Sequence, residues 1–399
     1  MTETVVFIAN GFTRENVRLQ PWRYLYEIAR RISQVARVVV ITEGDEDSDE
    51  ILWQEGLYVV RSRHLSVRCQ EKLAELISLY DPKQLWWSVT PRSVAYRKVF
   101  RAIHCEKYAL ITCPLYSYLQ LIRATLAGVP WVELRALWSQ RIVPRRLFVS
   151  MLRSNTFRKL FVQSKSNADI LARSGIPQDK LSILRVGLDP DDYSPVDEDV
   201  ISAEKFRLDM DDRCVSLLYF GAIRKIRGFY ALIDAFSLVA KDNSDAMLVV
   251  LARGADESVV SEVKKLVARK NLEGRVRVVG GWLSRQQVWA QIELTSLVVL
   301  PFVIVPSDIP IAILESLARG KPVVGSPIDG IPELISGHGV IVDPLDTRSF
   351  AGELLSLLEN KDEIARLGNC ARDFMSDYPD WELVGKQAMQ EAGLVEMAQ

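Results

Sequence analysis

Short runs of apolar and β-branched residues recur along the whole chain, and each is followed by a stretch with helical spacing. Runs without polar alternation are typical of strands buried on both faces. Such strands alternating with helices predict an α/β fold with a doubly wound parallel sheet in each half. The predicted strands are 5–9, 38–42, 58–60, 110–112, 131–134, 160–163 and 183–184 in the first half, and 217–220, 247–251, 276–279, 297–300, 323–324 and 340–342 in the second.

The length and one turn-rich segment divide the chain into two parts. A chain of 399 residues is long for a single hydrophobic core. Residues 187–197 contain two prolines, one glycine and four aspartates, a composition typical of a linker. We therefore expect a first domain at residues 1–190 and a second domain at residues 191–375.

The candidate functional residues are most concentrated in residues 297–346. A buried strand is followed by a polar break and then by a helix that we expect to begin after Pro310, because proline is tolerated in a first helical turn. The amides of Ile311 and Ala312 then lack partners within the helix, and such a helix start binds anions. Glu315 lies about one turn further along. This geometry suits a diphosphate with a sugar on each side.

The same stretch resembles glycosyltransferase family 4 through Leu-Glu315-Ser-Leu-Ala-Arg-Gly-Lys-Pro-Val-Val and the later Asp329-Gly-Ile-Pro-Glu333. The resemblance implies the GT-B architecture, in which two Rossmann-like domains face each other across a cleft. It also implies that residues 376–399 fold back onto the first domain. The implied activity is retaining transfer of a sugar from a nucleotide diphosphate sugar, bound by the second domain, to an acceptor held by the first.

The chain departs from the family pattern at the first of two acids. The family usually places an acid, seven residues and then a glutamate, which would put the first acid at Ser307. Asp308 is displaced from that position by one residue. We expect Asp308 to supply the carboxylate near the sugar, since the segment before the helix can absorb a one-residue shift. The alternative is that Asp308 only favours the positive end of the helix dipole.

A basic turn follows the predicted strand 217–220 and opens a helix. Here the family places an arginine and a lysine that neutralise the leaving diphosphate, and this chain has Ala222 and Arg227 at those positions. Arg224 and Lys225 lie nearby as substitutes. Arginine suits a diphosphate because its fork donates two parallel hydrogen bonds. The alternative is a solvated basic turn.

Four further residues are weaker candidates. Gly11 follows the first strand, where a glycine lets the backbone approach a phosphate, although an ordinary turn is an equal alternative. Trp282 ends a Gly-Gly-Trp segment that we expect near the nucleotide base. Glu133 and Arg135 lie where the family has cleft residues. They would contact the donor sugar or the acceptor, or else pair with each other.

The charge is distributed unevenly. Residues 1–195 carry a net charge of +8 and the remainder −9, and residues 82–165 contain fifteen basic residues against two acids. A basic half suggests an anionic partner, such as a membrane surface, a phosphorylated or lipid-linked acceptor, or nucleic acid. The family resemblance leaves nucleic acid unexpected. Residues 141–159 mix basic and bulky apolar side chains, which predicts either contact with anionic lipid or an ordinary packed helix.

The cysteines and the apolar runs bear on cofactors and location. Five cysteines without a Cys-x-x-Cys pair favour reduced thiols in a cytoplasmic protein and argue against a disulfide framework or a zinc site. Asp45 and Asp47 lie in a highly acidic segment that we interpret as a solvated loop. We therefore expect no metal and no cofactor beyond the nucleotide sugar. Without a long apolar run, any membrane contact would be peripheral, at the inner face.

Taken together, these features predict a metal-independent glycosyltransferase with Asp308, Arg227 and Glu315 as its catalytic residues. The rival hypothesis is a catalytically silent nucleotide-sugar binding or scaffold protein, which the departures at Ser307 and Ala222 support. An epimerase or hydrolase of nucleotide sugars on the same fold has no obvious base in the sequence.

Overall fold

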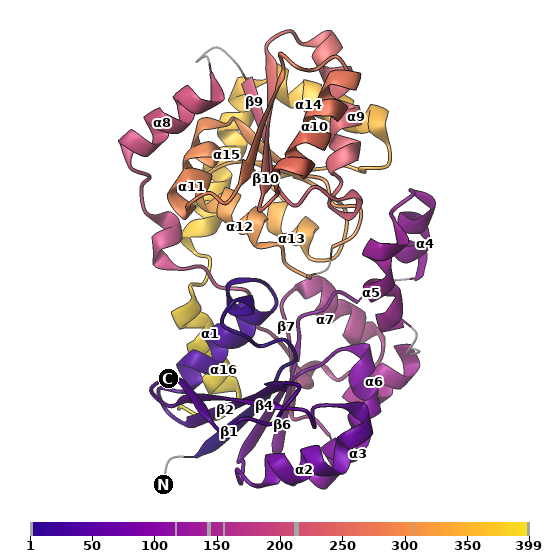
Figure 1. Ribbon diagram of the computed structural model, residues 1–399, viewed down its shortest axis with the longest axis vertical. Coiled ribbons are helices and arrows are strands. Elements are labelled where there is room, and N and C mark those ends of the chain that lie inside the picture. The colour runs from indigo at the N-terminus through magenta and orange to yellow at the C-terminus, as the bar shows by residue number, and fades with distance from the viewer. Residues whose placement is uncertain are drawn as a thin grey trace.

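Two α/β domains, each built on one sheet, make up the computed structural model, which describes residues 3–115, 118–141, 145–154, 156–210, 215–305 and 307–396 (Figure 1). The first sheet contains β1 (Thr4–Ile8), β2 (Arg37–Glu43), β3 (Ile51–Gln54), β4 (Leu57–Ser62), β5 (Gln84–Ser88), β6 (Glu106–Ile111), β7 (Lys159–Val162) and β8 (Leu181–Ile183). The second contains β9 (Val215–Gly221), β10 (Ala246–Arg253), β11 (Val276–Gly281), β12 (Leu297–Leu300), β13 (Val323–Gly325) and β14 (Gly339–Ile341).

The strand orders are those of doubly wound sheets. The first sheet has the order β3-β4-β2-β1-β5-β6-β7-β8, and the second has the order β11-β10-β9-β12-β13-β14. Neighbouring strands pair in parallel except β3 and β4, which form an antiparallel edge. In such sheets ligands bind beyond the carboxyl ends of the strands. The segments that follow β1, β7, β10 and β12 are therefore the first places to look for a site.

Helices cover both faces of each sheet. Those of the first domain are α1 (Trp22–Ile32), α2 (Gln70–Ser78), α3 (Arg97–Ala102), α4 (Tyr118–Leu126), α5 (Trp131–Arg141), α6 (Arg145–Arg153) and α7 (Lys165–Arg173). Those of the second are α8 (Glu198–Leu208), α9 (Phe229–Asp242), α10 (Glu257–Arg269), α11 (Arg285–Leu294), α12 (Ile311–Ala318), α13 (Ile331–Ile335), α14 (Thr347–Glu359) and α15 (Lys361–Ser376). The last helix, α16 (Trp381–Glu391), returns to the first domain beside α1 (Figure 1).

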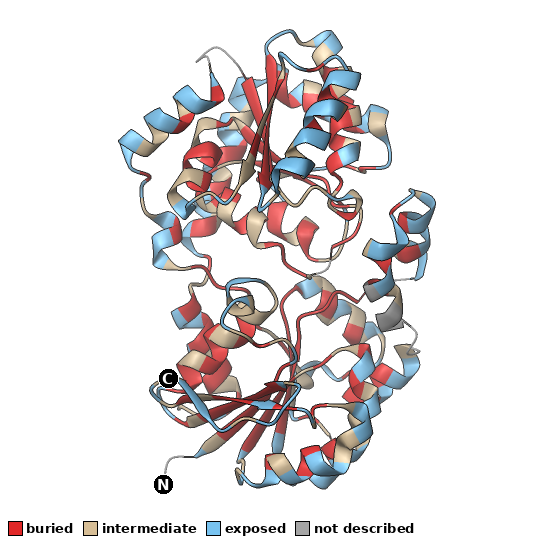
Figure 2. Cartoon of the chain, in the orientation of Figure 1, coloured by how far each residue is buried: buried red, intermediate tan, exposed pale blue. Residues whose placement is uncertain are grey.

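The strands form the buried interior of both domains (Figure 2). Trp86 on β5 is fully buried and stacks on Phe7 and Phe161, with ring centroids 5.4 and 5.2 Å away. No strand was expected at β5 or β3. Polar residues at both ends of β5 hide it from a search for apolar runs.

The predicted strand 131–134 is wrong, because these residues open α5. Pro130 precedes the helix and favours a first helical turn. Leu134 and Leu137, spaced by three, point inward and are buried. Packing at helical spacing has overridden the β-propensity of the Trp-Val pair at the start.

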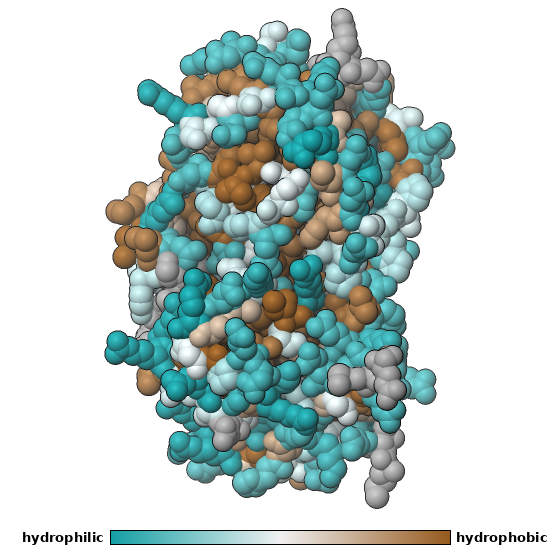
Figure 3. Space-filling model, turned by 180° about the vertical axis from the view of Figure 1, so that it is seen from behind, coloured by the Kyte–Doolittle hydropathy of each residue, from teal (hydrophilic) through white to brown (hydrophobic). Residues whose placement is uncertain are grey.

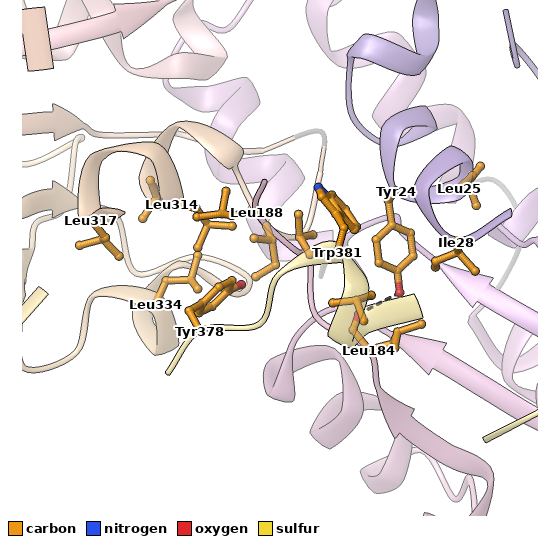
Figure 4. Packing of buried hydrophobic residues seen from close by; sticks show 14 of the residues in the cluster. Tyr24, Leu25, Ile28, Leu184, Leu188, Leu314, Leu317, Leu334, Tyr378 and Trp381 are labelled. Atoms are coloured by element: carbon orange, nitrogen blue, oxygen red, sulfur yellow. Dashed lines mark hydrogen bonds between the residues drawn. The ribbon is translucent and has the colours of Figure 1, made fainter. Parts of the chain in front are cut away.

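The chain crosses between the domains twice, and the two crossings are paired. The Leu188 amide donates to the Pro379 carbonyl (3.3 Å), and the Trp381 amide donates to the Leu188 carbonyl (3.2 Å). Trp381 packs near Tyr24, whose hydroxyl donates to the Leu184 carbonyl at 2.8 Å (Figure 4). These contacts hold α16 against the first domain, in an apolar cluster that includes Tyr24, Leu188 and Trp381.

No helix within the described ranges is long and apolar enough to span a bilayer.

Candidate active site

The start of α12 presents backbone amides between the domains. The helix begins at Ile311, after Pro310, which is extended (φ −74°, ψ 118°) and makes no side-chain cap. Ile311 and Ala312 are half-buried, and their amides have no acceptor within the helix because they occupy its first turn. The start of α12 therefore offers two backbone donors, as expected, and anion binding there stays a prediction.

Glu315 lies one turn into α12 and is half-buried. Burial raises the pKa of its carboxyl to about 7, and the nearby cations Arg253, Arg285 and Arg23 partly oppose that shift. These arginines come from β10, α11 and α1, so Glu315 lies where both domains contribute charge. A carboxyl in this position accepts hydrogen bonds from hydroxyl groups such as those of a ribose.

The basic turn is a short helix, η6 (Lys225–Arg227). Arg227 is half-buried, with its guanidinium carbon 5.4 Å from the centroid of the Phe302 ring, and burial lowers its pKa. Within the described residues Arg227 makes no salt bridge and no side-chain hydrogen bond. A desolvated guanidinium without a protein counter-ion is suited to bind an anionic ligand.

The other two cations of the turn differ in their surroundings. Arg224 is exposed and is likewise unpaired among the described side chains. Lys225 donates from Nζ to the Gly128 carbonyl of the first domain at 3.1 Å. Lys225 therefore links the two domains, and Arg227 and Arg224 are the cations of this turn without a partner among the described side chains.

Asp308 is fully buried between the domains. Burial raises the pKa of its carboxyl to about 8, partly offset by Ser164 and Asn167 at the start of α7. Neither carboxyl oxygen has a hydrogen bond of normal geometry to a described residue, and no side chain caps α12. The carboxyl thus faces the first domain, with its hydrogen-bonding capacity unused.

The segment Asp329-Gly-Ile-Pro-Glu333 of the second domain contacts the start of α7 in the first domain. Both oxygens of Glu333 accept hydrogen bonds from α7, from the amides of Lys165 and Ser166, each at 3.1 Å. Asp329 has a left-handed backbone (φ 49°), and burial raises its pKa to about 7. A glutamate of the second domain therefore caps a helix of the first.

We call α4, α5 and the loop between them (residues 118–141) the hairpin; it lies against the second domain (Figure 1). Glu133 accepts a hydrogen bond from the Ile226 amide of η6 at 3.1 Å, and Arg123 forms an ion pair with Asp343. Leu121 and Leu134 are buried in one cluster with Ile226 and Ile304 of the second domain.

Glu133 therefore orients the basic turn and does not pair with Arg135, which is exposed.

Gly11 and Trp282 lie at strand ends on opposite domains. Gly11 follows β1 with φ 72°, and its amide donates to the Glu43 carboxylate at 2.6 Å. That amide is engaged, so Gly11 offers no free donor in this arrangement. Trp282 follows β11 with 81% of its surface exposed, and its ring lies against Gly254.

Sequence reasoning missed several charged residues near the contact of the two domains: Arg23, Arg253, Arg285, the half-buried Asp329, and Glu333 as a cap. Arg253 was detectable, because it is the last residue of β10 and ligands bind beyond the carboxyl ends of strands. The positions of Arg23 and Glu333 depend on how the two domains meet, which no local pattern records.

Comparison with known proteins identifies the chemistry. Residues 215–360 match the family model described as "Glycosyl transferases group 1". The alpha-D-kanosaminyltransferase of Streptomyces kanamyceticus is 24% identical over 313 residues, which cover 74% of this chain and 78% of that protein. This chain is a glycosyltransferase. The resemblance to glycosyltransferase family 4 is confirmed.

Another relative agrees with this identification, and solved structures share the fold. The amylovoran biosynthesis glycosyltransferase AmsK of Erwinia amylovora is 24% identical over 51% of this glycosyltransferase and 48% of its own length. Anabaena HepE in complex with UDP superposes with a TM-score of 0.72 at 16% identity, covering 98% of this chain and 100% of HepE. Sucrose-phosphate synthase from Thermosynechococcus elongatus superposes with a TM-score of 0.70 at 14% identity, covering 98% of both. The predicted GT-B fold is confirmed.

Proposed function

We propose that this glycosyltransferase moves a sugar, with retention of configuration, from a nucleotide diphosphate sugar to an acceptor held by the first domain. One observation carries the proposal: Arg227 has no protein counter-ion among the described residues, and its turn adjoins the segment that leads to α12. Gly228, directly after Arg227, packs so closely on the Pro301 carbonyl that a Cβ would lie 1.7 Å from its oxygen. This contact holds the basic turn against the end of β12, from which the chain runs to α12, and so supports one site formed by the turn and the free amides.

Each group then has a role in the transfer. The amides of Ile311 and Ala312, with Arg227 and Arg224, stabilise the charge that develops on the departing diphosphate. Glu315 accepts hydrogen bonds from the ribose hydroxyls. With arginines and a helix start supplying positive charge, the reaction proceeds without a divalent metal.

Asp308 is the proposed carboxyl on the sugar side. Its two oxygens are buried and have no hydrogen-bond partner among the described residues, and a sugar hydroxyl could supply that partner. With a pKa of about 8, the group is mostly protonated at neutral pH and both donates and accepts hydrogen bonds. In the retaining mechanism attributed to family 4, a donor phosphate oxygen deprotonates the acceptor, so no carboxylate nucleophile is required.

The acceptor in this proposal is anionic or lipid-linked, and the protein is cytoplasmic with a peripheral contact at the inner face of the membrane. The basic residues 82–165, which include the hairpin, support this part.

A panel of UDP-, GDP- and ADP-sugars tests the activity. Transfer to an acceptor, or slow hydrolysis of one donor, is expected. Anabaena HepE was solved with UDP and with UDP-glucose, which supports including both in the panel. Tight donor binding without any turnover would instead support the catalytically silent scaffold.

A further inference from the structure

The outer face of the hairpin carries an apolar stripe that no described residue of the chain covers. Leu119, Ile122 and Leu126 are spaced by three and four residues along α4, and so lie on one face of the helix. They are 73%, 46% and 83% exposed. At the start of α5, Trp131 and Val132 are 65% and 66% exposed. We call these five residues the apolar stripe.

Figure 3 shows hydrophobic side chains projecting at the edge of the molecule where α4 lies. Single exposed apolar side chains are normal on a protein surface, whereas contiguous groups of them mark binding surfaces. The inner face of the hairpin already supplies the contact with the second domain through Leu121 and Leu134. The apolar stripe is therefore not needed to hold the two domains together.

The charge around the apolar stripe is positive. Arg135 on α5 and Arg146 on α6, the next helix along the chain, are exposed. Residues 82–165 contain only two acids, and both are engaged: Glu106 pairs with Arg158, and Glu133 accepts the Ile226 amide. Exposed leucines and a tryptophan beside unopposed arginines are the composition of surfaces that lie in the interface of anionic membranes.

We propose that the apolar stripe inserts into the surface of a bilayer containing anionic lipid, while Arg135 and Arg146 contact the lipid headgroups. This inference rests on the proposed function only in that a lipid-linked acceptor would be presented at that surface. It narrows the membrane contact from the whole basic region to the tip of one hairpin. It also requires apolar insertion in addition to charge attraction.

Docking at the apolar stripe would act on the donor site through the inner face of the hairpin. Glu133 holds the Ile226 amide, and the Gly128 carbonyl holds Lys225, so both bonds end on the turn that carries Arg227. A bilayer that fixes the hairpin therefore also restricts the basic turn. Transfer should be faster on vesicles than with the same acceptor in solution.

Flotation on vesicles tests the docking. The wild-type protein should float with vesicles that contain phosphatidylglycerol and not with pure phosphatidylcholine. Leu119→Ser combined with Leu126→Ser should weaken binding about tenfold or more. Arg146→Gln should weaken binding about fivefold and reduce the sensitivity of binding to salt, because one charge contact that salt can screen is lost. Phe206→Ser, which removes an 89% exposed side chain on α8 of the second domain, is the matched control and should float like the wild type.

Several results of these experiments would contradict docking of the apolar stripe on a membrane. Undiminished flotation of the double serine variant, or equal flotation on neutral vesicles, would overturn the proposal. So would a wild-type dimer in solution that the same variant disperses, because a second copy would then cover the apolar stripe. Nucleotide affinity measured without vesicles should be unchanged in the double variant. Loss of that affinity would also overturn the proposal, because the substitutions would have disturbed the donor site itself.

A failure of the donor panel with normal flotation would refute the activity and leave the docking intact.

Discussion

Replacing Asp308 by asparagine should make the protein more stable at neutral pH and much less active. The side chain is fully buried, and its pKa is raised from 3.8 to about 8. Between those values the folded state keeps a proton that the unfolded state has lost. The free energy of unfolding therefore falls as the pH rises from about 4 to about 8.

The free-energy cost of ionising Asp308 follows from the gap between its folded pKa and its unfolded pKa. At pH 7 the shift spans roughly three pH units, which corresponds to a cost of about 4 kcal/mol. Asparagine does not ionise and avoids this cost, but its amide must be satisfied by Ser164 and Asn167, at a penalty of about 1–3 kcal/mol. A net gain of about 1–3 kcal/mol remains. It would raise the melting temperature by about 2–4 °C for each kcal/mol in a domain of this size.

The assay pairs thermal melting with transfer rates. The melting temperature of Asp308→Asn should exceed that of the wild type at about pH 7 and fall below it as the pH drops through about 4, where the aspartate becomes protonated in both states and only the penalty of the asparagine amide remains. Transfer should fall by about two orders of magnitude, or about 2.7 kcal/mol, if the carboxyl contacts the sugar. Asp373→Asn, at an exposed position, is the matched control. Equal melting at neutral pH would refute the burial argument, and a near-normal rate would refute the catalytic role.

Three further results are expected. Glu315→Ala should weaken nucleotide binding about 10- to 150-fold with the fold intact, because hydrogen bonds to a charged acceptor are worth about 1.5–3 kcal/mol; unchanged affinity by calorimetry would remove Glu315 from the site. Arg227→Ala should lower kcat more than it raises the donor KM, since the charge on the diphosphate grows in the transition state; an equal effect of the distant Arg269→Ala would contradict this role. Transfer should persist in EDTA, and a loss that Mn²⁺ or Mg²⁺ restores would contradict the metal-free proposal.

Local patterns were sufficient where one segment determines its own structure. The helix start at Ile311 follows from the proline before it, and the buried strands follow from their apolar runs. The hairpin shows the limit of such reasoning. Residues 131–134 have strand-like composition, but Leu134 and Leu137 gain burial against Ile304 only when α5 is helical. That contact joins residues about 170 positions apart, so no window of the sequence contains it.

Charged residues at the contact between the two domains were the hardest to predict. Glu333 was recognised as part of a motif, yet its hydrogen bonds go to Lys165 and Ser166 in the other domain. Lys225 was assigned to the donor and instead reaches Gly128. A charged side chain can satisfy a ligand or a distant backbone group equally well, and only the assembled domains determine which.

The paired crossings at Leu188 and Pro379–Trp381 restrict how the two domains can move. A single linker would let the domains tumble independently, whereas two strands joined by backbone hydrogen bonds allow mainly rotation about one axis. At Gly187 a Cβ would lie 2.7 Å from the Trp381 nitrogen, so the two strands touch at the pivot itself. Any opening of the first domain relative to the second is therefore confined to one path, which returns the two domains to the same alignment.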